Sequence, residues 1–114
     1  METKTMFKIA RDFSSEPFGR YPSDGPFNGE KFREDILRPL LSRYSIVTVD
    51  IDGTEGYGSS FLEEAFGGLV RKGYFTAEDL RHHLKISSHA AAFRTYVTSI
   101  WKYIDQASND RATA

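Results

Sequence analysis

One segment in the middle of the chain most constrains the fold: residues 47–70, VTVDIDGTEGYGSSFLEEAFGGLV. It begins with an apolar, β-branched run that is typical of a buried strand. It ends in apolar residues spaced as on one face of a helix. That stripe consists of Phe61, Leu62, Ala65, Phe66, Leu69 and Val70. The segment therefore predicts a strand, a glycine-rich loop and a helix in direct succession, with Gly73 as the residue that closes the helix.

Two further segments are expected to form strands. Loose alternation of apolar and polar residues predicts a strand over Thr5–Phe13. A last strand is expected over Leu84–Ser87. The segment Ser14–Gly29 is dense in serine, proline and glycine, which predicts a loop, although it is long enough to contain another strand.

A helix before the central strand is predicted from Phe32, Ile36, Leu37, Leu40 and Leu41. Asn28 is expected to cap its start, with Glu30 near its positive end. Pro39 is expected to bend this helix or to end its regular hydrogen bonding.

Two helices are predicted after the central unit. Thr76–Asp79 resembles a capping box that starts a short helix ending near His83. The last helix is indicated by Phe93, Val97, Ile100, Trp101 and Ile104. Ser87 or Ser88 is expected to cap it, and residues 108–114 are expected to form a frayed tail.

The alternation of strands and helices predicts an α/β fold. We expect a single domain over residues 1–114, built as a small two-layer sandwich. Its mixed sheet would have about four strands packed against about four helices. A chain of 114 residues is long enough to bury one such core.

Composition narrows the classes of function. Fifteen basic and sixteen acidic residues give a net charge of −1, which argues against a nucleic-acid-binding domain. The absence of cysteine excludes disulfides and thiolate metal sites. No apolar run is long enough for a membrane span, and the first residues lack a signal-peptide pattern. We expect a cytoplasmic protein without a cofactor.

The glycine-rich loop can be interpreted as a site for an anion. Backbone amides and a helix N-terminus would face a phosphate, and Gly53, Gly56 and Gly58 would allow it to approach. However, GTEGYGSS matches neither GxxxxGK nor GxGxxG, and Glu55 adds a negative charge. A small-ligand or nucleotide sensor therefore stays an alternative.

A catalytic interpretation has less support. A nucleophilic serine needs a base such as histidine, but the three histidines lie far along the chain, and GYGSS is not the GxSxG motif. The histidine pair His82–His83 is better explained as an exposed helix end. Asp50, Asp52 and Glu55 could hold a metal ion and support a metal-assisted activity, which remains a minor alternative.

The two serines of the loop are expected to differ in role. Ser60 and Glu63 fit a capping box, with Ser60 accepting from the Glu63 amide. Ser59 would then lie outside the helix with a spare hydroxyl. A phosphate on Ser59 would face the positive end of the helix.

The strand, loop, serine pair and helix resemble the STAS domain, named for sulphate transporters and anti-sigma-factor antagonists. That family has Asp-Ser-Ser/Thr-Gly-Leu after its strand and loop. The chain is similar in particular to STAS-like proteins of unknown function. These share a GRY…DGP…GE.FRE.IL.PLL segment, here Gly19–Leu41, and a VD.DGTEGYGSSFLEEAFGGLVR segment, here Val49–Arg71.

The resemblance implies a function as a non-catalytic interaction module in bacterial regulation. In STAS antagonists, a kinase-like ATPase phosphorylates the first serine of the motif, and added charge weakens the complex. That role would fall on Ser59, and a histidine-kinase-like ATPase of the anti-sigma type would be the partner. Two positions depart from the family: Gly58 replaces the aspartate, and Phe61 replaces the glycine after the serines.

Two loops are expected to form the docking surface for that partner or a ligand. The first runs through Asp52, Gly53, Thr54, Glu55, Gly56, Tyr57, Gly58 and Ser59. The second carries Phe18, Arg20, Tyr21 and Phe27, residue types that interface hot spots favour. The alternative for these rings is that they cover one end of the core.

Overall fold

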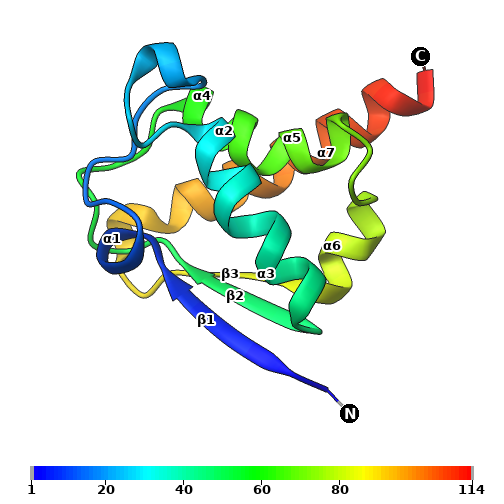
Figure 1. Cartoon of the computed structure of the whole chain (residues 1–114), viewed down its shortest axis with the longest axis horizontal. Helices are drawn as coiled ribbons and strands as arrows, with labels where there is room; N and C mark the ends of the chain where they lie inside the picture. The colour runs from blue at the N-terminus through cyan, green and yellow to red at the C-terminus, as the bar shows by residue number, and fades with distance from the viewer. Residues whose placement is uncertain (1, 114) are drawn as a thin grey trace.

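The computed structural model describes residues 2–113 and shows an α/β fold. Within those residues the sheet contains β1 (Lys4–Lys8), β2 (Ile46–Asp50) and β3 (Leu84–Ser87). The strands lie in the order β1-β2-β3 and both pairs are parallel. Figure 1 shows the sheet along the lower side, with the long helices above it. The predicted fold class and two layers are confirmed.

The sheet differs in detail from the predicted one: within residues 2–113 it has three strands, where about four were expected, and it is parallel, where a mixed sheet was expected. Residues 14–28 contain no strand, and their only regular element is a 3₁₀ turn, η1 (Pro22–Asp24). The first strand is also shorter than predicted, because α1 (Ile9–Asp12) starts directly after Lys8. The connections between consecutive strands contain helices, and a helical crossover returns the chain to the same end of the sheet. All three strands are therefore parallel.

The first long helix consists of three consecutive parts. They are α2 (Gly29–Lys31), a π-helical turn η2 (Phe32–Leu37) and α3 (Arg38–Arg43). Asn28 caps the start, as predicted, by accepting a hydrogen bond from the Lys31 amide. The regular hydrogen bonding is interrupted in η2, just before Pro39, but the helix continues past the proline.

The second long helix has the same construction. It comprises α4 (Ser59–Leu62), a π-helical turn η3 (Glu63–Gly67) and α5 (Gly68–Arg71). Gly73 closes it with φ +77°, as predicted. The Gly73 amide donates to the Val70 carbonyl and the Tyr74 amide to the Leu69 carbonyl. These two bonds define a Schellman motif, which satisfies the last carbonyls of the helix.

The third helix is α6 (Ala77–His83), and its predicted capping box between Thr76 and Asp79 is confirmed. The last is α7 (Arg94–Thr113), preceded by a 3₁₀ turn, η4 (Ala91–Phe93). Neither Ser87 nor Ser88 caps it, since Ala90 precedes η4 and the Ser88 hydroxyl donates to Asp52.

The predicted frayed tail was also wrong for the described part of residues 108–114. Helix α7 continues to Thr113. The Arg111 guanidinium donates to the Arg71 carbonyl over 3.1 Å, so the end of α7 is bound to the end of α5.

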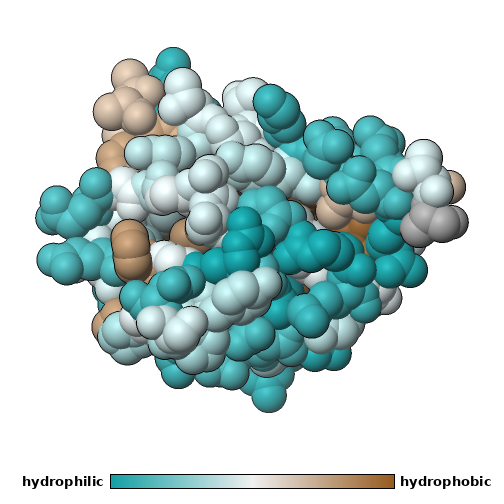
Figure 2. Space-filling view, turned by 90° about the horizontal axis from the view of Figure 1, so that it is seen from above, coloured by the Kyte–Doolittle hydropathy of each residue, from teal (hydrophilic) through white to brown (hydrophobic). Residues whose placement is uncertain are grey.

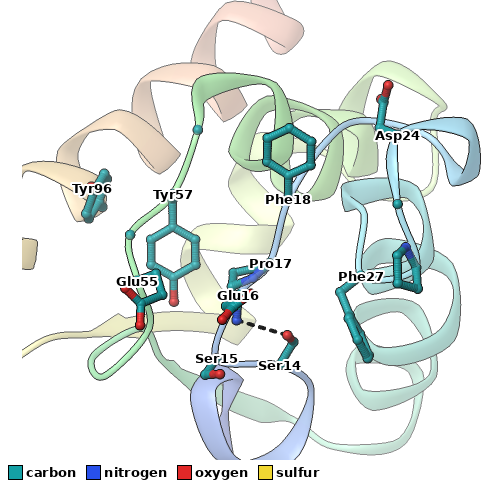
Figure 3. A pocket seen from close by; sticks show the side chains of 14 residues that line it. Ser14, Ser15, Glu16, Pro17, Phe18, Asp24, Phe27, Glu55, Tyr57 and Tyr96 are labelled. Carbon is teal, nitrogen blue, oxygen red and sulfur yellow. Dashed lines mark hydrogen bonds between the residues drawn. The ribbon is translucent and has the colours of Figure 1, made fainter.

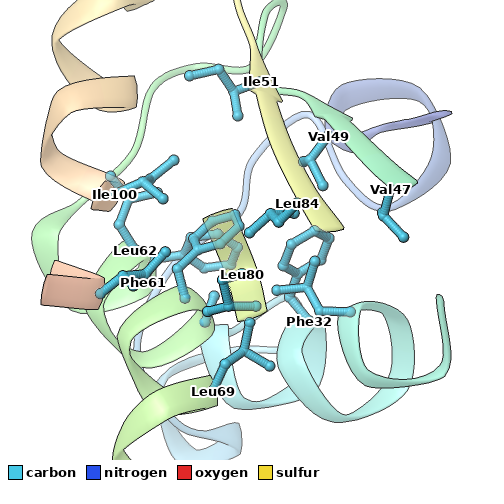
Figure 4. Packing of buried hydrophobic residues seen from close by; sticks show 14 of the residues in the cluster. Phe32, Val47, Val49, Ile51, Phe61, Leu62, Leu69, Leu80, Leu84 and Ile100 are labelled. Atoms are coloured by element: carbon cyan, nitrogen blue, oxygen red, sulfur yellow. The ribbon is translucent and has the colours of Figure 1, made fainter. Parts of the chain in front are cut away.

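The core lies between the sheet and the long helices. Val47 and Val49 of β2 face the helices, and their side chains are fully buried. Figure 4 shows them with Leu84 of β3 opposite Phe32, Phe61 and Leu69. The parallel register explains this, because Thr5, Phe7, Leu84 and Ile86 pair with Val47 or Val49 and share their face. Within residues 2–113, every helix is too short or too polar to span a bilayer.

Candidate functional site

The two loops singled out in the sequence lie side by side and enclose an open groove of about 1100 Å³. One wall comes from the Ser14–Phe27 loop and the other from Glu55–Gly58. Tyr96 of α7 also lines it. Figure 3 shows Tyr57 and Glu55 on one segment, with Pro17 and Phe18 on the other. The glycine-rich loop starts at the carboxyl end of β2, an edge at which α/β folds commonly bind ligands.

Backbone hydrogen bonds fix the two walls. The Glu55 amide donates to the Ser15 carbonyl over 2.8 Å and joins one loop to the other. The Phe18 amide donates to the Phe27 carbonyl over 3.0 Å and closes the Ser14–Phe27 loop, called the aromatic loop below, on itself. The groove therefore has a defined backbone frame before any partner binds.

Aromatic rings form much of the lining. Tyr57 is 8% exposed, and its hydroxyl donates to the Ile51 carbonyl over 2.7 Å. Burial raises the pKa of Tyr57, although a hydrogen bond with Thr54 opposes the shift. The ring of Tyr57 meets that of Tyr96 edge to face, with centroids 5.2 Å apart. Gly56, at φ +118°, makes this contact possible, since a Cβ there would lie 3.1 Å from the Tyr96 hydroxyl.

Three aromatic side chains of the first loop reach into solvent. Phe18, Tyr21 and Phe27 are 67%, 46% and 39% exposed, so they do not serve mainly to cover the core. Phe27 still packs against Phe13, with ring centroids 5.4 Å apart. In Figure 2, brown side chains appear among teal ones at the left end, which carries this loop in Figure 1. Large exposed rings gathered on one loop are typical of interaction surfaces.

Charges in the groove are all negative. Its lining includes Glu16, Asp24 and Glu55, and none of its residues is Lys, Arg or His. The carboxylate of Asp24 is engaged, because the Tyr21 and Arg20 amides donate to it and lower its pKa. A groove with this charge disfavours phosphate, which weakens the nucleotide-sensor alternative.

The structure does not gather the three acidic residues considered for a metal. The Asp52 carboxylate accepts from the Ser88 hydroxyl and from the His89 and Ala90 amides. Partial burial opposes ionisation, but these hydrogen bonds outweigh it and lower the pKa of Asp52. Asp52 thus anchors the segment before α7. Within residues 2–113, no three histidine or acidic side chains are placed to hold a metal ion together.

Ser59 and Ser60 both lie in the first turn of α4, and both are exposed. The predicted cap at Ser60 was wrong. Gly58 is the N-cap residue, and no side chain caps the helix there. The helix starts one residue before Ser60, which places Ser60 inside its first turn, and the Glu63 carboxylate is engaged by the guanidinium groups of Arg20 and Arg71. Ser59 is therefore the first helical residue, directly after Gly58 of the groove.

A buried ion network escaped the sequence analysis entirely. The Arg33 side chain of η2 and the Glu64 side chain of η3 are fully or almost fully buried and pair with each other. Arg33 also donates to the Glu64 carbonyl over 2.7 Å. Arg20 and Arg71 contact Glu64 at 2.9 and 3.1 Å. Arg20, considered as a docking residue, therefore holds the aromatic loop onto the second long helix.

Three glycines make room for this network. A Cβ at Gly68 would lie 2.5 Å from the Arg33 guanidinium, and one at Gly67 would lie 2.8 Å from the Glu63 carboxylate. Gly29 brings the two long helices together, since a Cβ there would lie 2.7 Å from the Phe61 carbonyl. The signal in the sequence was the Gly67-Gly68 pair inside a predicted amphipathic helix, a pattern that marks close packing.

Comparison with known protein families matches residues 28–91 to a STAS-like domain of unknown function. The chain belongs to this family. The matched residues of the STAS-like domain include the glycine-rich loop and the Arg33–Glu64 pair. Searches of curated proteins and of solved structures found no significant match.

Proposed function

We propose that this STAS-like domain is a protein-interaction module without catalysis of its own. The observation that carries the proposal is the position of Ser59. It is exposed at the start of α4, directly after Gly58 of the aromatic groove. An exposed hydroxyl at the edge of a groove with exposed aromatic residues combines a docking surface with a group that a kinase can reach.

The proposed partner is an ATPase of the histidine-kinase-like, anti-sigma type. This step comes from the resemblance of the serine segment to STAS antagonists. Phe61, which replaces the family's glycine, is fully buried, so it leaves the surface around Ser59 unobstructed. Gly58 replaces the aspartate, which removes one negative charge beside Ser59. Gly58 also lines the groove, so Ser59 directly follows a groove residue.

Addition of a phosphate at Ser59 would weaken docking through charge. The groove already carries the carboxylates of Glu16 and Glu55. A further negative charge of roughly 1.5 to 2 at the edge of the groove would have to be desolvated beneath a bound partner, and this cost opposes docking even of a basic segment. The favourable field at the start of α4 would keep the phosphate near the helix N-terminus.

The test of the switch compares three variants in pull-downs from the native host. We expect Ser59→Asp to release a partner that wild type and Ser59→Ala both retain. Ser60→Asp is the matched control, since it adds the same charge one residue further along the same exposed turn. Equal retention by Ser59→Asp and Ser59→Ala would refute the switch.

Docking itself is tested by Phe18→Ala. Phe18 is 67% exposed, so its loss should leave folding intact and weaken partner retention. Hot-spot aromatics typically contribute about 2 kcal/mol or more, which corresponds to at least a roughly thirtyfold loss of affinity.

The competing nucleotide-sensor function would be supported instead by thermal stabilisation of the protein by nucleotides. A micromolar ligand at millimolar concentration adds about 4 kcal/mol to the free energy of unfolding.

A further inference from the structure

The groove also indicates the chemistry of its occupant, an inference that rests on the proposed docking function. Among residues 2–113, neither Glu16 nor Glu55 takes part in a salt bridge. Both residues are exposed. The hydrogen bond between the Glu55 amide and the Ser15 carbonyl brings Glu55 beside the residue that precedes Glu16. Two carboxylates are thus held at one place without a cation.

The lining also contains four aromatic residues and two prolines, namely Phe18, Phe27, Tyr57, Tyr96, Pro17 and Pro26. Phe18 and Pro17 stand on one wall, opposite Tyr57 on the other, as Figure 3 shows. Rings beside carboxylates suit a planar cation, because a guanidinium stacks on an aromatic face and pairs with a carboxylate at its edge. A compact ammonium ion uses the carboxylates but gains less from the rings.

The protein already uses this chemistry elsewhere. The Arg38 guanidinium lies 3.5 Å from the centre of the Tyr74 ring and also pairs with Glu34. The Arg81 guanidinium lies 4.8 Å from the Trp101 ring and pairs with Asp105. In both places one arginine is shared between a ring and a carboxylate. The groove offers the ring and the carboxylate, and its lining contains no arginine.

We propose that the groove binds an extended, arginine-containing segment of a partner protein. The arginine side chain would pack against the aromatic lining and pair with Glu16 and Glu55. The open shape and the volume of about 1100 Å³ accommodate a peptide strand rather than an enclosed small molecule. The proline and aromatic residues provide the type of surface on which extended peptides dock.

The test uses synthetic probes, because the partner is unidentified. Three fluorescent peptides of equal length alternate proline with arginine, lysine or glutamate, and their binding is measured by anisotropy at low and high salt. We expect the arginine probe to bind most tightly, the lysine probe more weakly, and the glutamate probe not at all. Amide shifts in an NMR titration should be concentrated at Gly56, Tyr57 and Gly58.

The variant Glu16→Gln/Glu55→Gln should weaken the arginine probe about fivefold, as expected from the loss of two exposed ion pairs. Both positions are exposed, so the variant should retain the wild-type melting temperature. The matched control is Glu2→Gln/Glu78→Gln, which removes two exposed carboxylates that do not line the groove. It should leave the affinity unchanged.

Two results would overturn the assignment of arginine: equal binding of the lysine probe, or full affinity in the Glu16→Gln/Glu55→Gln variant. These results would leave the docking function intact if Phe18→Ala still releases the native partner. Conversely, a partner that is indifferent to Phe18→Ala would refute docking at the groove, even if the arginine probe binds there.

Discussion

At the scale of single residues, the buried pair Arg33–Glu64 is the most consequential feature. Both side chains are withdrawn from water, yet no buried side-chain polar atom in the described residues lacks a hydrogen-bond partner. A buried ion pair contributes little net stability compared with apolar side chains of similar volume, but the removal of one partner leaves an uncompensated charge. The pair therefore acts mainly on the specificity of helix packing.

This predicts a strong asymmetry between single and double variants. Arg33→Met should lower the free energy of unfolding by about 3 to 5 kcal/mol, because Glu64 stays buried without its main partner. Arg33→Met combined with Glu64→Leu should recover most of that loss. Urea denaturation followed by circular dichroism measures both. A double variant as unstable as Arg33→Met alone would contradict this account.

Glu64 also predicts how the stability of the protein depends on pH. Burial opposes ionisation of Glu64, but hydrogen bonds from Arg33 and Arg20 outweigh it, so its pKa in the folded protein lies below the ordinary 4.5. The unfolded chain then binds more protons near pH 4.5, so stability is present above that pH and is lost as the pH falls through the folded pKa.

Melting temperatures from pH 7 to pH 3 provide the measurement. Glu64→Gln should make the acid limb of the curve less steep, since it removes one of the carboxylates whose pKa is lowered in the folded protein. Glu16→Gln is the control, because its exposed side chain forms no salt bridge within residues 2–113, and it should leave the limb unchanged. Identical limbs for Glu64→Gln and wild type would mean that Glu64 does not contribute to the loss of stability in acid.

At the scale of elements, the sequence predicted the helices and strands better than their contacts. Apolar spacing located the strand Ile46–Asp50, and local capping chemistry located the ends at Asn28, Gly73 and Thr76. Such signals lie within a few residues of each other. Local spacing did not reveal that the Glu63 carboxylate, the expected partner of Ser60, is engaged by Arg20, which lies far away in the chain.

Two glycines at the start of the long helices should differ in how strongly alanine destabilises the protein. Gly29→Ala should destabilise the protein by about 1 to 3 kcal/mol, because its Cβ would meet the Phe61 carbonyl at 2.7 Å and force the helices apart. Gly58→Ala should change the free energy of unfolding by no more than about 0.5 kcal/mol, because the stiffer unfolded chain offsets the poorer capping by alanine at this N-cap position. The φ of Gly58, −79°, suits alanine, and no neighbouring atom lies within 4 Å of the Cβ that alanine would add.

Thermal denaturation of both glycine variants at one concentration gives the comparison. Equal stability of Gly29→Ala and wild type would mean that α2 and α4 do not depend on this close approach.

At the scale of the whole molecule, the sequence predicted the two layers but not which loops face each other across the groove. Apolar periodicity is enough to assign an α/β sandwich. It does not show that the loop with Phe18 and the loop with Tyr57 face each other, because Ser15 and Glu55 are brought together only by the folded chain. The groove was thus predicted as two separate loops, and its negative charge was seen only in part, at Glu55.

The end of α7 provides a test of how the last helix is attached to the rest of the domain. A chain that ends at Ala107 should lose about 1 kcal/mol of stability, because the hydrogen bond from Arg111 to the Arg71 carbonyl disappears. Hydrogen exchange should then rise at Gly73 and Tyr74, where α5 ends. Arg111→Ala alone should reproduce part of the effect. Unchanged hydrogen exchange at Gly73 and Tyr74 in the shortened chain would mean that residues 108–113 do not stabilise the end of α5.

The π-helical turns η2 and η3 have a consequence for how the length of this family can vary. Arg33 lies in one turn and Glu64 in the other. A π-helical turn closes i→i+5 hydrogen bonds and an α-helix i→i+4 bonds, so deletion of a single residue from either turn would change the hydrogen bonding around Arg33 or Glu64. That change would shift the side chain relative to its partner. Relatives that keep the pair should therefore show no single-residue gaps within residues 32–37 or 63–67, whereas the loop over residues 14–27 can change length.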